Sequence, residues 1–407
     1  MSDEQSSPIR VLHVITRMIV GGAQENTLLS VEGLNNLPTY DVALVSGVDR
    51  GPEGDLVART RQTTDLVLIP ELARNVNPIA DSVALFKLYS LIKKGRYHIV
   101  HTHLAKAGVL GRIAAWLART PIIVHGLHGL VFHEYQPWLV NRTWWAVQKI
   151  VGPITDHYIS VSSVISQKAI EAGIASTDNL TTIYSGMELD WFLNADVDPE
   201  TVRRQLGIPD NAPVVGKIAR MVSIKNHDAL LDAAPEIIAR YPDVRFLLVG
   251  DGPLLGHLRS RAKQMGITKQ VVFAGLVPRE RIPEMLSVMD VLAHTALYEG
   301  LPRVLAQALA MGKPCVAYDA DGAREVVVAG ETGYLVQPGD TVGLAVAVNQ
   351  LLEDPQLRAR MGEAGRRRVD PAFRAETMVQ QIDRVYQDLM HQYARRLARV
   401  APRTVKT

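Results

Sequence analysis

Two cations are the first residues of this sequence whose types and spacing suit a chemical task. Arg220 and Lys225 lie in a segment that follows the apolar run 214–218 and precedes a helical pattern. At the carboxyl end of a strand, an arginine fork and a lysine point charge suit a diphosphate group. Both side chains can also be solvated surface charges, and the spacing alone leaves the two interpretations open.

A carboxylate follows a later apolar run in the same half of the chain. Glu299 stands before Gly300, Leu301 and Pro302, which lead into a helical segment. A carboxylate there can accept hydrogen bonds from sugar hydroxyls. It can equally stabilise the helix start, because the helix dipole favours negative charge at that end.

The first half of the chain offers a glycine pair and a histidine. Gly21 and Gly22 stand between an apolar run and an amphipathic stretch. Glycine lets backbone N–H groups approach a phosphate, and a helix N-terminus adds a favourable dipole. The pair matches neither the dinucleotide nor the P-loop fingerprint, and a plain turn also explains it. His128 follows another apolar run in a glycine-containing loop, where it can contact substrate or handle a proton.

Four further histidines accompany His128. His101 and His103 alternate along an expected strand, so their rings should point the same way. A metal site is one use of such a pair, but neither a carboxylate cluster nor further cysteines accompany it. We therefore expect no bound metal. For His101, His125 and His133 a structural role is the stronger interpretation.

Alternating elements must position these residues. Short apolar runs alternate with helical patterns through the first half, and the alternation restarts after the proline-containing loop 208–213. This repetition predicts α/β domains with mostly parallel sheets covered on both faces. We predict an N-terminal domain over 1–200, a C-terminal domain over 201–374, and a final helix with a basic tail over 375–407.

Composition excludes several classes of protein. The chain has 407 residues, 47% hydrophobic and 21% charged, which can bury a large core. Its net charge of +2 disfavours a nucleic-acid binder. The single Cys315 excludes an intrachain disulfide and fits a reducing compartment. The polar start 1–9 lacks a signal-peptide core, and no apolar run is long enough to span a membrane. We expect a cytoplasmic protein.

The order of the motifs is more specific than any one of them. They are Gly21-Gly22-Ala23-Gln24, His-Thr-His-x-x-Lys-Ala-Gly from His101 to Gly108, the segment 124–129, Arg220-x4-Lys225, the segment 248–253, and Glu299-Gly300-Leu301-Pro302. This series, over about residues 10 to 390, resembles the family 4 retaining glycosyltransferases of the GT-B fold. The resemblance implies two Rossmann-like domains facing each other across a cleft, with the last helix crossing back to the N-terminal domain.

The resemblance also implies roles for individual residues. The C-terminal domain would hold a nucleotide-sugar donor, and the N-terminal domain would hold the acceptor. The implied contacts are Arg220 and Lys225 on the donor diphosphate, Gly21 and Gly22 on the same phosphate, Glu299 with the backbone of Gly300 and Leu301 at the donor sugar, and His128 beside the transferred sugar.

One position departs from the family pattern. The Glu-x7-Glu motif begins at Glu299 but has Gln307 where the second glutamate usually accepts bonds from the nucleotide ribose. Glutamine keeps an acceptor oxygen and lacks the charge. Lesser departures are Asp321 before Gly322, where a glycine pair is common, and Glu188 in a segment that usually ends in aspartate.

The resulting expectation is a metal-independent transferase with no cofactor. It would move a sugar from a nucleotide sugar, UDP by default, to a glycan, lipid-linked or small-molecule acceptor with retained configuration. Two alternatives remain, a non-catalytic sugar-nucleotide-binding protein, which Gln307 makes plausible, and a nucleotide-sugar 2-epimerase of the same fold. A dehydrogenase is disfavoured because the glycine fingerprint is missing.

Aromatic and basic segments concern the acceptor and a membrane. The aromatic segment contains Tyr135, Trp138, Trp144 and Trp145 with Arg142 and Lys149, and the basic clusters are Arg366, Arg367 and Arg368 and then Arg395, Arg396, Arg399, Arg403 and Lys406. The aromatic residues either meet a lipid-linked acceptor or pack against their own domain. The basic clusters are either solvated or bind anionic lipid at the inner membrane face. No nucleic-acid partner is expected.

Overall fold

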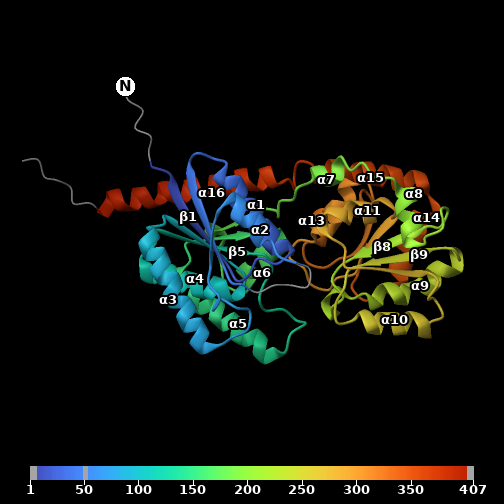
Figure 1. The fold of residues 1–407 in the computed structure, drawn as a ribbon, viewed down its shortest axis with the longest axis horizontal. Coiled ribbons are helices and arrows are strands. Elements are labelled where there is room, and N and C mark those ends of the chain that lie inside the picture. Colours follow the sequence, from blue (N-terminus) through green and yellow to red (C-terminus); the bar gives the residue numbers. More distant parts are fainter. Residues whose placement is uncertain (1–6, 49–53, 401–407) are drawn as a thin grey trace, which may run out of the picture. The chain divides into compact units, whose positions relative to one another are not determined.

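Seven parallel strands form the sheet of the first of two units into which the chain divides, Met1–Met187 with Ala375–Thr407. The computed structural model describes residues 7–48 and 54–400 (Figure 1). The strand order is β3-β2-β1-β4-β5-β6-β7. The strands are β1 (Ile9–Ile15), β2 (Tyr40–Ser46), β3 (Asp65–Leu68), β4 (Ile99–His103), β5 (Ile122–Leu127), β6 (His157–Ser160) and β7 (Leu180–Thr182).

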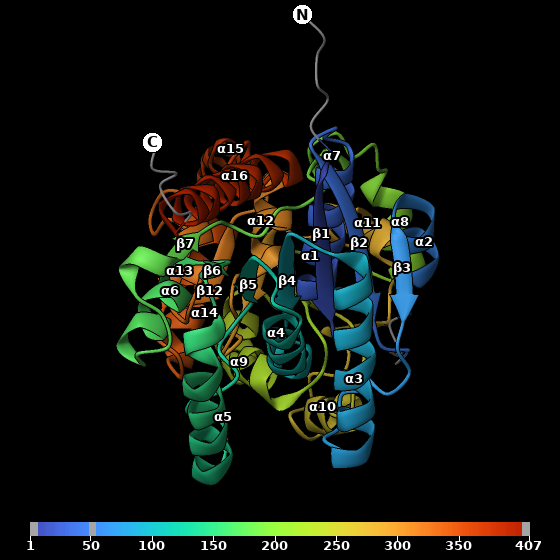
Figure 2. The same cartoon turned by 90° about the vertical axis from the view of Figure 1, so that its left-hand side faces the viewer.

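Helices cover both faces of this sheet, as Figures 1 and 2 show. One face carries α1 (Gly22–Asn35) and α16 (Ala375–Val400), and the other carries α3 (Pro78–Gly95), α4 (Ala105–Ala118) and α5 (Trp138–Val151). Successive side chains of β1 point to opposite faces of the sheet, so the strand contributes to two hydrophobic cores. Val11 and Ile15 pack with α1 and α16, whereas Leu12 and Val14 pack with α3 and α4.

The last helix returns to the first unit. The backbone N–H of Ala375 donates to the carbonyl of Met187 at 3.0 Å. Met378 and Tyr386 of α16 are buried in the core that contains Val11 and Leu28. Burial of side chains of this size contributes about 1.5–3 kcal/mol each. The predicted crossing of the C-terminal helix back to the N-terminal domain is confirmed.

The second unit, Glu188–Arg374, holds a six-stranded parallel sheet in the order β10-β9-β8-β11-β12-β13. Its strands are β8 (Val214–Ile218), β9 (Arg245–Val249), β10 (Val271–Gly275), β11 (Val291–His294), β12 (Cys315–Tyr318) and β13 (Gly333–Val336). The helices α9 (Asp228–Arg240) and α14 (Thr341–Glu353) share one core with the sheet. The helices α12 (Arg303–Ala310) and α15 (Pro355–Val369) pack against each other.

Shorter helices complete the two units. They are α2 (Val57–Thr63), α6 (Ser163–Glu171), α7 (Asp190–Leu193), α8 (Pro199–Leu206), α10 (Leu255–Gln264), α11 (Ile282–Ser287) and α13 (Ala323–Val326). The boundary predicted between residues 200 and 201 lies inside α8, and the units themselves divide earlier, at Met187. Among the described residues, no helix combines the length and the apolar character that a bilayer crossing requires.

Both sheets reverse their strand order next to their first strand. In the first unit this point lies between β1 and β4, and in the second it lies between β8 and β11. Open parallel sheets bind ligands at the carboxyl ends of the strands at such a switch point. The prediction of two Rossmann-like α/β domains is confirmed, and the switch points tell us where to look for sites.

Candidate functional site

The switch point of the second unit brings two predicted site residues together. Lys225 ends a short 3₁₀ turn after β8, and Glu299 lies in the loop after β11. The Nζ of Lys225 is 2.8 Å from Oε1 of Glu299, and Nε2 of His294 is 3.1 Å from Oε2. All three side chains therefore belong to one polar cluster at the strand ends.

The charge state of Glu299 follows from these neighbours. Burial alone would raise the pKa of Glu299, but Lys225 and His294 lower that pKa well below its usual range. The Glu299 side chain is 28% exposed as a whole, whereas its Oε2 is buried. An ionised carboxylate is an acceptor only, which suits hydroxyl groups of a bound sugar.

The backbone around Glu299 is fixed by the loop after β12. The N–H of Glu299 donates to Oδ2 of Asp321 at 2.9 Å. A Cβ at Gly322 would lie 2.3 Å from the carbonyl oxygen of Gly300, so only glycine allows this contact between the loops. The departure at Asp321 therefore supplies a carboxylate that holds the Glu299 backbone. Gly300 and Leu301 are buried, and Gln307 is half-buried in α12.

Arg220 projects from a loop that a glycine turn supports. The Met221 N–H donates to the Asp251 carbonyl at 2.8 Å, and the Leu254 N–H donates to the Met221 carbonyl at 3.1 Å. Gly250 has a φ of +132°, and a Cβ there would lie 2.2 Å from the Ala219 carbonyl oxygen. The motif at 248–253 thus supports the loop that carries Arg220. The Arg220 side chain itself is exposed.

A second lysine lies beneath this cluster and was missed in the sequence. Lys217 of β8 is fully buried, and its Nζ donates to Oγ1 of Thr295 at 2.7 Å. Burial first and the charge of Lys225 second lower the pKa of Lys217 to about 7, and Glu299 opposes both. A lysine inside the apolar run Val214–Ile218 was the available signal, because such residues are seldom buried without a partner.

In the first unit, Gly21 and Gly22 form the start of α1. Gly21 is the N-cap residue, and its carbonyl accepts from the Glu25 N–H at 2.9 Å. The first-turn N–H groups of a helix have no acceptor within that helix, and glycine brings no side chain to cover them. The assigned contact with a donor phosphate stays a prediction.

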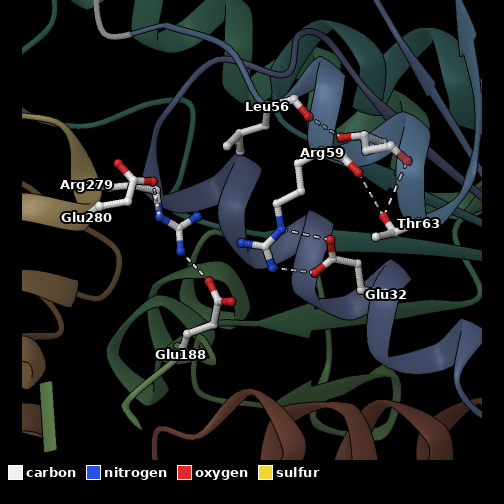
Figure 3. Close-up of polar contacts among 8 residues, drawn as sticks. Glu32, Leu56, Arg59, Thr63, Glu188, Arg279 and Glu280 are labelled. Atoms are coloured by element: carbon white, nitrogen blue, oxygen red, sulfur yellow. Dashed lines mark hydrogen bonds and ion pairs between the residues drawn. The ribbon is translucent and has the colours of Figure 1, made fainter. Parts of the chain in front are cut away.

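Ion pairs join neighbouring segments within each unit, as Figure 3 shows. Arg59 of α2 binds Glu32 of α1 through two bonds of 2.9 and 2.6 Å. In the second unit, Arg279 bonds to Glu188 and lies 4.8 Å above the Trp191 ring. Glu188, which stands where the family usually has aspartate, therefore pairs with Arg279. Paired, partly buried arginines of this kind fix local geometry.

His128 lies in the first unit at the carboxyl end of β5. Its Nε2 is 3.0 Å from Nδ1 of His103, and the residue lines a pocket of about 1000 Å³. His101 and His103 lie on one face of β4, with ring centroids 4.3 Å apart. His125 bonds instead to Oγ1 of Thr102 at 2.9 Å.

Apolar side chains from several elements and three cations line the pocket beside His128. Helix α5 contributes four of the apolar residues. The lining includes Leu139, Val140, Trp144 and Val147 of α5, Leu110, Phe132, Arg17, Arg74 and Lys106. The Lys106 ammonium pairs with Asp81. A pocket that combines apolar walls with a few polar groups suits a partly apolar ligand.

The tryptophans of the aromatic segment have different surroundings, and contact with an acceptor stays a prediction. Trp145 packs against its own unit, since its Nε1 donates to the Ala172 carbonyl at 3.1 Å and Arg142 lies 4.7 Å above its ring. Trp144 lines the pocket, and Trp138 is 74% exposed. Packing within the unit and lining of the pocket are therefore divided among different residues of one helix.

The first basic cluster and the cysteine have structural explanations, and the role of the second cluster stays a prediction. Arg366 donates to the carbonyls of Ala310 and Leu193, and Arg368 donates to that of Glu325. Arg403, Lys406 and the side chain of Arg399 lie outside the described residues. Cys315 is buried in β12, and burial raises the pKa of its thiol, which makes it a core residue.

Comparison with known proteins now defines the class. The model described as glycosyl transferases group 1 matches residues 198–368, and the model described as glycosyltransferase family 4 matches residues 20–191. The chain is therefore an α/β glycosyltransferase of the GT-B type. It belongs to the family 4 glycosyltransferases, and the sequence-based assignment is confirmed.

Two curated relatives and one solved structure are similar to this chain over most of its length. An Escherichia coli protein named UDP-Gal:alpha-D-GlcNAc-diphosphoundecaprenol alpha-1,3-galactosyltransferase is 28% identical over 94% of this chain and 98% of its own. N-acetyl-alpha-D-glucosaminyl L-malate synthase of Bacillus anthracis is 27% identical over 77% of this chain and 80% of its own. The structure of Anabaena HepE in complex with UDP and glucose has a TM-score of 0.78 at 23% identity, covering 93% of this chain and 100% of its own.

Proposed function

We propose that this chain transfers a sugar from a UDP-sugar to a saccharide carried on a lipid diphosphate. The reaction retains the anomeric configuration and uses no metal. The observation that carries the acceptor assignment is the pocket of about 1000 Å³ beside His128, because it joins apolar walls to cationic side chains. An acceptor with a hydrocarbon chain, a diphosphate and a sugar has matching chemistry.

The donor assignment rests on the cluster at the switch point of the second unit. The departing nucleoside diphosphate gains negative charge as the glycosidic bond breaks, and Arg220 and Lys225 would stabilise that charge. One such fixed donor is worth about 2.7–4 kcal/mol in the transition state. The ionised Glu299 would accept bonds from hydroxyl groups of the donor sugar. UDP is the proposed nucleotide because HepE was crystallised with UDP and glucose, and the E. coli relative is named for UDP-Gal.

The acceptor assignment has support from the same relative. Its name includes a diphosphoundecaprenol-linked sugar, and it matches this chain over almost the whole length of both proteins. The identity of 28% leaves the particular sugar and linkage open to variation. We therefore propose the class of acceptor, a polyprenyl-type diphosphate sugar, and not one compound.

Exposed apolar side chains fit a membrane-borne acceptor. Ile79 near the start of α3 is 81% exposed, and Trp138 and Leu139 at the start of α5 are 74% and 69% exposed. The starts of α3 and α5 extend past the same end of the first sheet (Figure 2). Tryptophan and aliphatic residues of this kind insert at membrane interfaces. We propose that this edge contacts the inner membrane face in the cytoplasm.

The test is a transfer assay. The donors are a panel of UDP-, GDP- and ADP-sugars, and the acceptor is a diphosphate-linked sugar that carries either a long or a short lipid. We expect turnover with a UDP-sugar, better with the long lipid, and no loss when EDTA is added. Arg220→Ala and Glu299→Ala should each lower turnover by about 10²–10³-fold. Arg240→Ala, an exposed arginine of the same unit, is the matched control.

The outcomes separate the hypotheses. Equal turnover of wild type, Arg220→Ala and Glu299→Ala would show that the donor site is misassigned. Tight UDP-sugar binding without turnover would favour the non-catalytic alternative. Sedimentation with vesicles that contain or lack anionic lipid tests the membrane contact, and Trp138→Ser should weaken it. Binding that Trp138→Ser leaves unchanged would remove this edge from the membrane assignment.

A further inference from the structure

Four hydrogen bonds link His128 to the buried interior of the first unit. From the surface inward, Nε2 of His128 meets Nδ1 of His103 at 3.0 Å, and Nε2 of His103 meets Nδ1 of His13 at 2.9 Å. Nε2 of His13 then meets the Tyr386 hydroxyl at 3.3 Å, and that hydroxyl meets Nδ1 of His101 at 2.7 Å. We call these five residues the histidine chain.

Strand geometry and the last helix create this arrangement. His13 of β1 and His101 and His103 of β4 lie on the sheet face that carries α16, the helix of Tyr386. Gly126 of β5 leaves the room they need, because a Cβ there would lie 2.8 Å from Nδ1 of His103. His13, His101, His103 and Tyr386 are all at most 2% exposed.

Every inner member of the chain is uncharged near neutral pH. Burial lowers the pKa of His13 to about 3 and holds the pKa of His101 and His103 well below the usual range. Burial raises the pKa of Tyr386 well above its usual range. Each imidazole therefore carries one N–H, and the tyrosine carries one O–H. With one proton per group, the direction of one bond restricts the direction of the next.

The inner end of the histidine chain, at His101, determines the direction in which all four hydrogen bonds point. Nε2 of His101 is buried and has no hydrogen-bond partner among the described residues. If His128 donated to His103 and each further bond pointed inward in the same way, the Nε2–H of His101 would be buried without an acceptor. If Tyr386 accepted from both His13 and His101, its own O–H would be unpaired instead. Buried donors without an acceptor are rarer than acceptors without a donor.

Only the outward direction leaves no donor unpaired. His101 donates to Tyr386, Tyr386 donates to His13, His13 donates to His103, and His103 donates from Nδ1 to Nε2 of His128. We propose that the histidine chain fixes His128 in the Nδ1–H tautomer and thereby makes its Nδ1 a hydrogen-bond donor toward the substrate pocket. The role of this donor in transfer rests on the proposed function, whereas the tautomer does not.

A shared metal ion is the competing use of these histidines. Candidate ligand atoms of His13, His101 and His103 lie within 4.8 Å of one another. Ligands of one zinc ion converge on it, each at about 2.0–2.1 Å. Two nitrogens that face each other across 2.9 Å, as in His13 and His103, are instead arranged for a proton between them. The geometry thus favours the hydrogen-bonded histidine chain over a shared metal ion.

The test is two-bond ¹H–¹⁵N NMR on the full chain with ¹⁵N-labelled histidine, in which His128→Gln identifies the His128 signals. We expect a protonated Nδ1 and an unprotonated Nε2 in the wild type. His103→Asn can still donate to His128 and should keep this pattern. His103→Leu has a similar size but no donor, so His128 should shift toward the Nε2–H form that free imidazoles favour.

Activity gives a second readout on the same pair of variants. His103→Leu should lower kcat/KM by about tenfold, the effect of one hydrogen bond, and His103→Asn should restore most of it. An Nε2–H tautomer in the wild type overturns the proposal, as does a zinc-induced loss of these N–H signals or the same tautomer in both variants. The wild-type spectrum, assigned with His128→Gln, needs no turnover. Absence of transfer with every donor would therefore refute the proposed function and leave this test intact.

Discussion

Replacing the buried Lys217 by methionine should stabilise the second unit near neutral pH. Methionine has a similar length and no charge, so it fills the space in β8 without the cost of burying an ammonium group. The change leaves no new unpaired donor. Oγ1 of Thr295, which accepts from Lys217, still donates to the carbonyl of Asn226 at 2.5 Å.

The magnitude follows from the pKa of Lys217. Burial lowers that pKa to about 7, whereas an unfolded lysine titrates at about 10.4. Between these values the unfolded chain binds more protons than the native chain, so the free energy of unfolding of the wild type rises with pH. Below pH 7 both states are mostly protonated, and the full penalty of about 3–6 kcal/mol remains. Lys217→Met lacks the penalty at every pH.

The assay is urea unfolding of wild type and Lys217→Met from pH 6 to pH 10, with hydrogen exchange used to assign the transition of the second unit. The stability gain should be largest at pH 6–7 and should fall by roughly 2–3 kcal/mol by pH 9. Lys269→Met, an exposed lysine of the same unit, should stay within about 0.5 kcal/mol of wild type. A gain that does not change with pH, or a loss at pH 7, would refute the reasoning.

Three other substitutions test the remaining contacts. Gly126→Ala places a methyl group 2.8 Å from Nδ1 of His103, so thermal unfolding should show a loss of about 1–3 kcal/mol together with lower turnover. Glu299→Gln should destabilise the chain at pH 7. Because the folded-state pKa of Glu299 is depressed, the difference from wild type should shrink as pH falls below about 4.3, and an equal difference at both pH values would contradict this. The buried guanidinium of Arg112 donates to Gln148, Thr155 and the Gly108 carbonyl, and Arg112→Lys loses this set of hydrogen bonds. The amide hydrogens of α5 should then exchange faster. Unchanged exchange would show that these hydrogen bonds are dispensable.

The order of motifs predicted the fold because each motif marks the end of a strand. Arg220, Glu299 and His128 all follow short apolar runs, and parallel strands place such positions at one edge of a sheet. The period of two also predicted that His101 and His103 share a face. Short-range pattern could not supply Tyr386, which bonds to His101 from 285 positions away. Neither could it show that Lys217 is buried in β8 with Thr295 as its partner.

The two units use ionisable side chains in opposite ways. The second unit gathers Lys225, Glu299 and Lys217 within one cluster, where Lys225 lowers the pKa of both other groups and Glu299 raises that of Lys217. The first unit buries His103 and its neighbours in the neutral form, so the chain that ends at His128 provides direction without charge. A leaving diphosphate needs charge stabilisation, and a sugar hydroxyl needs an oriented partner. The division of labour proposed for the transfer reaction therefore matches the electrostatics of each unit taken by itself.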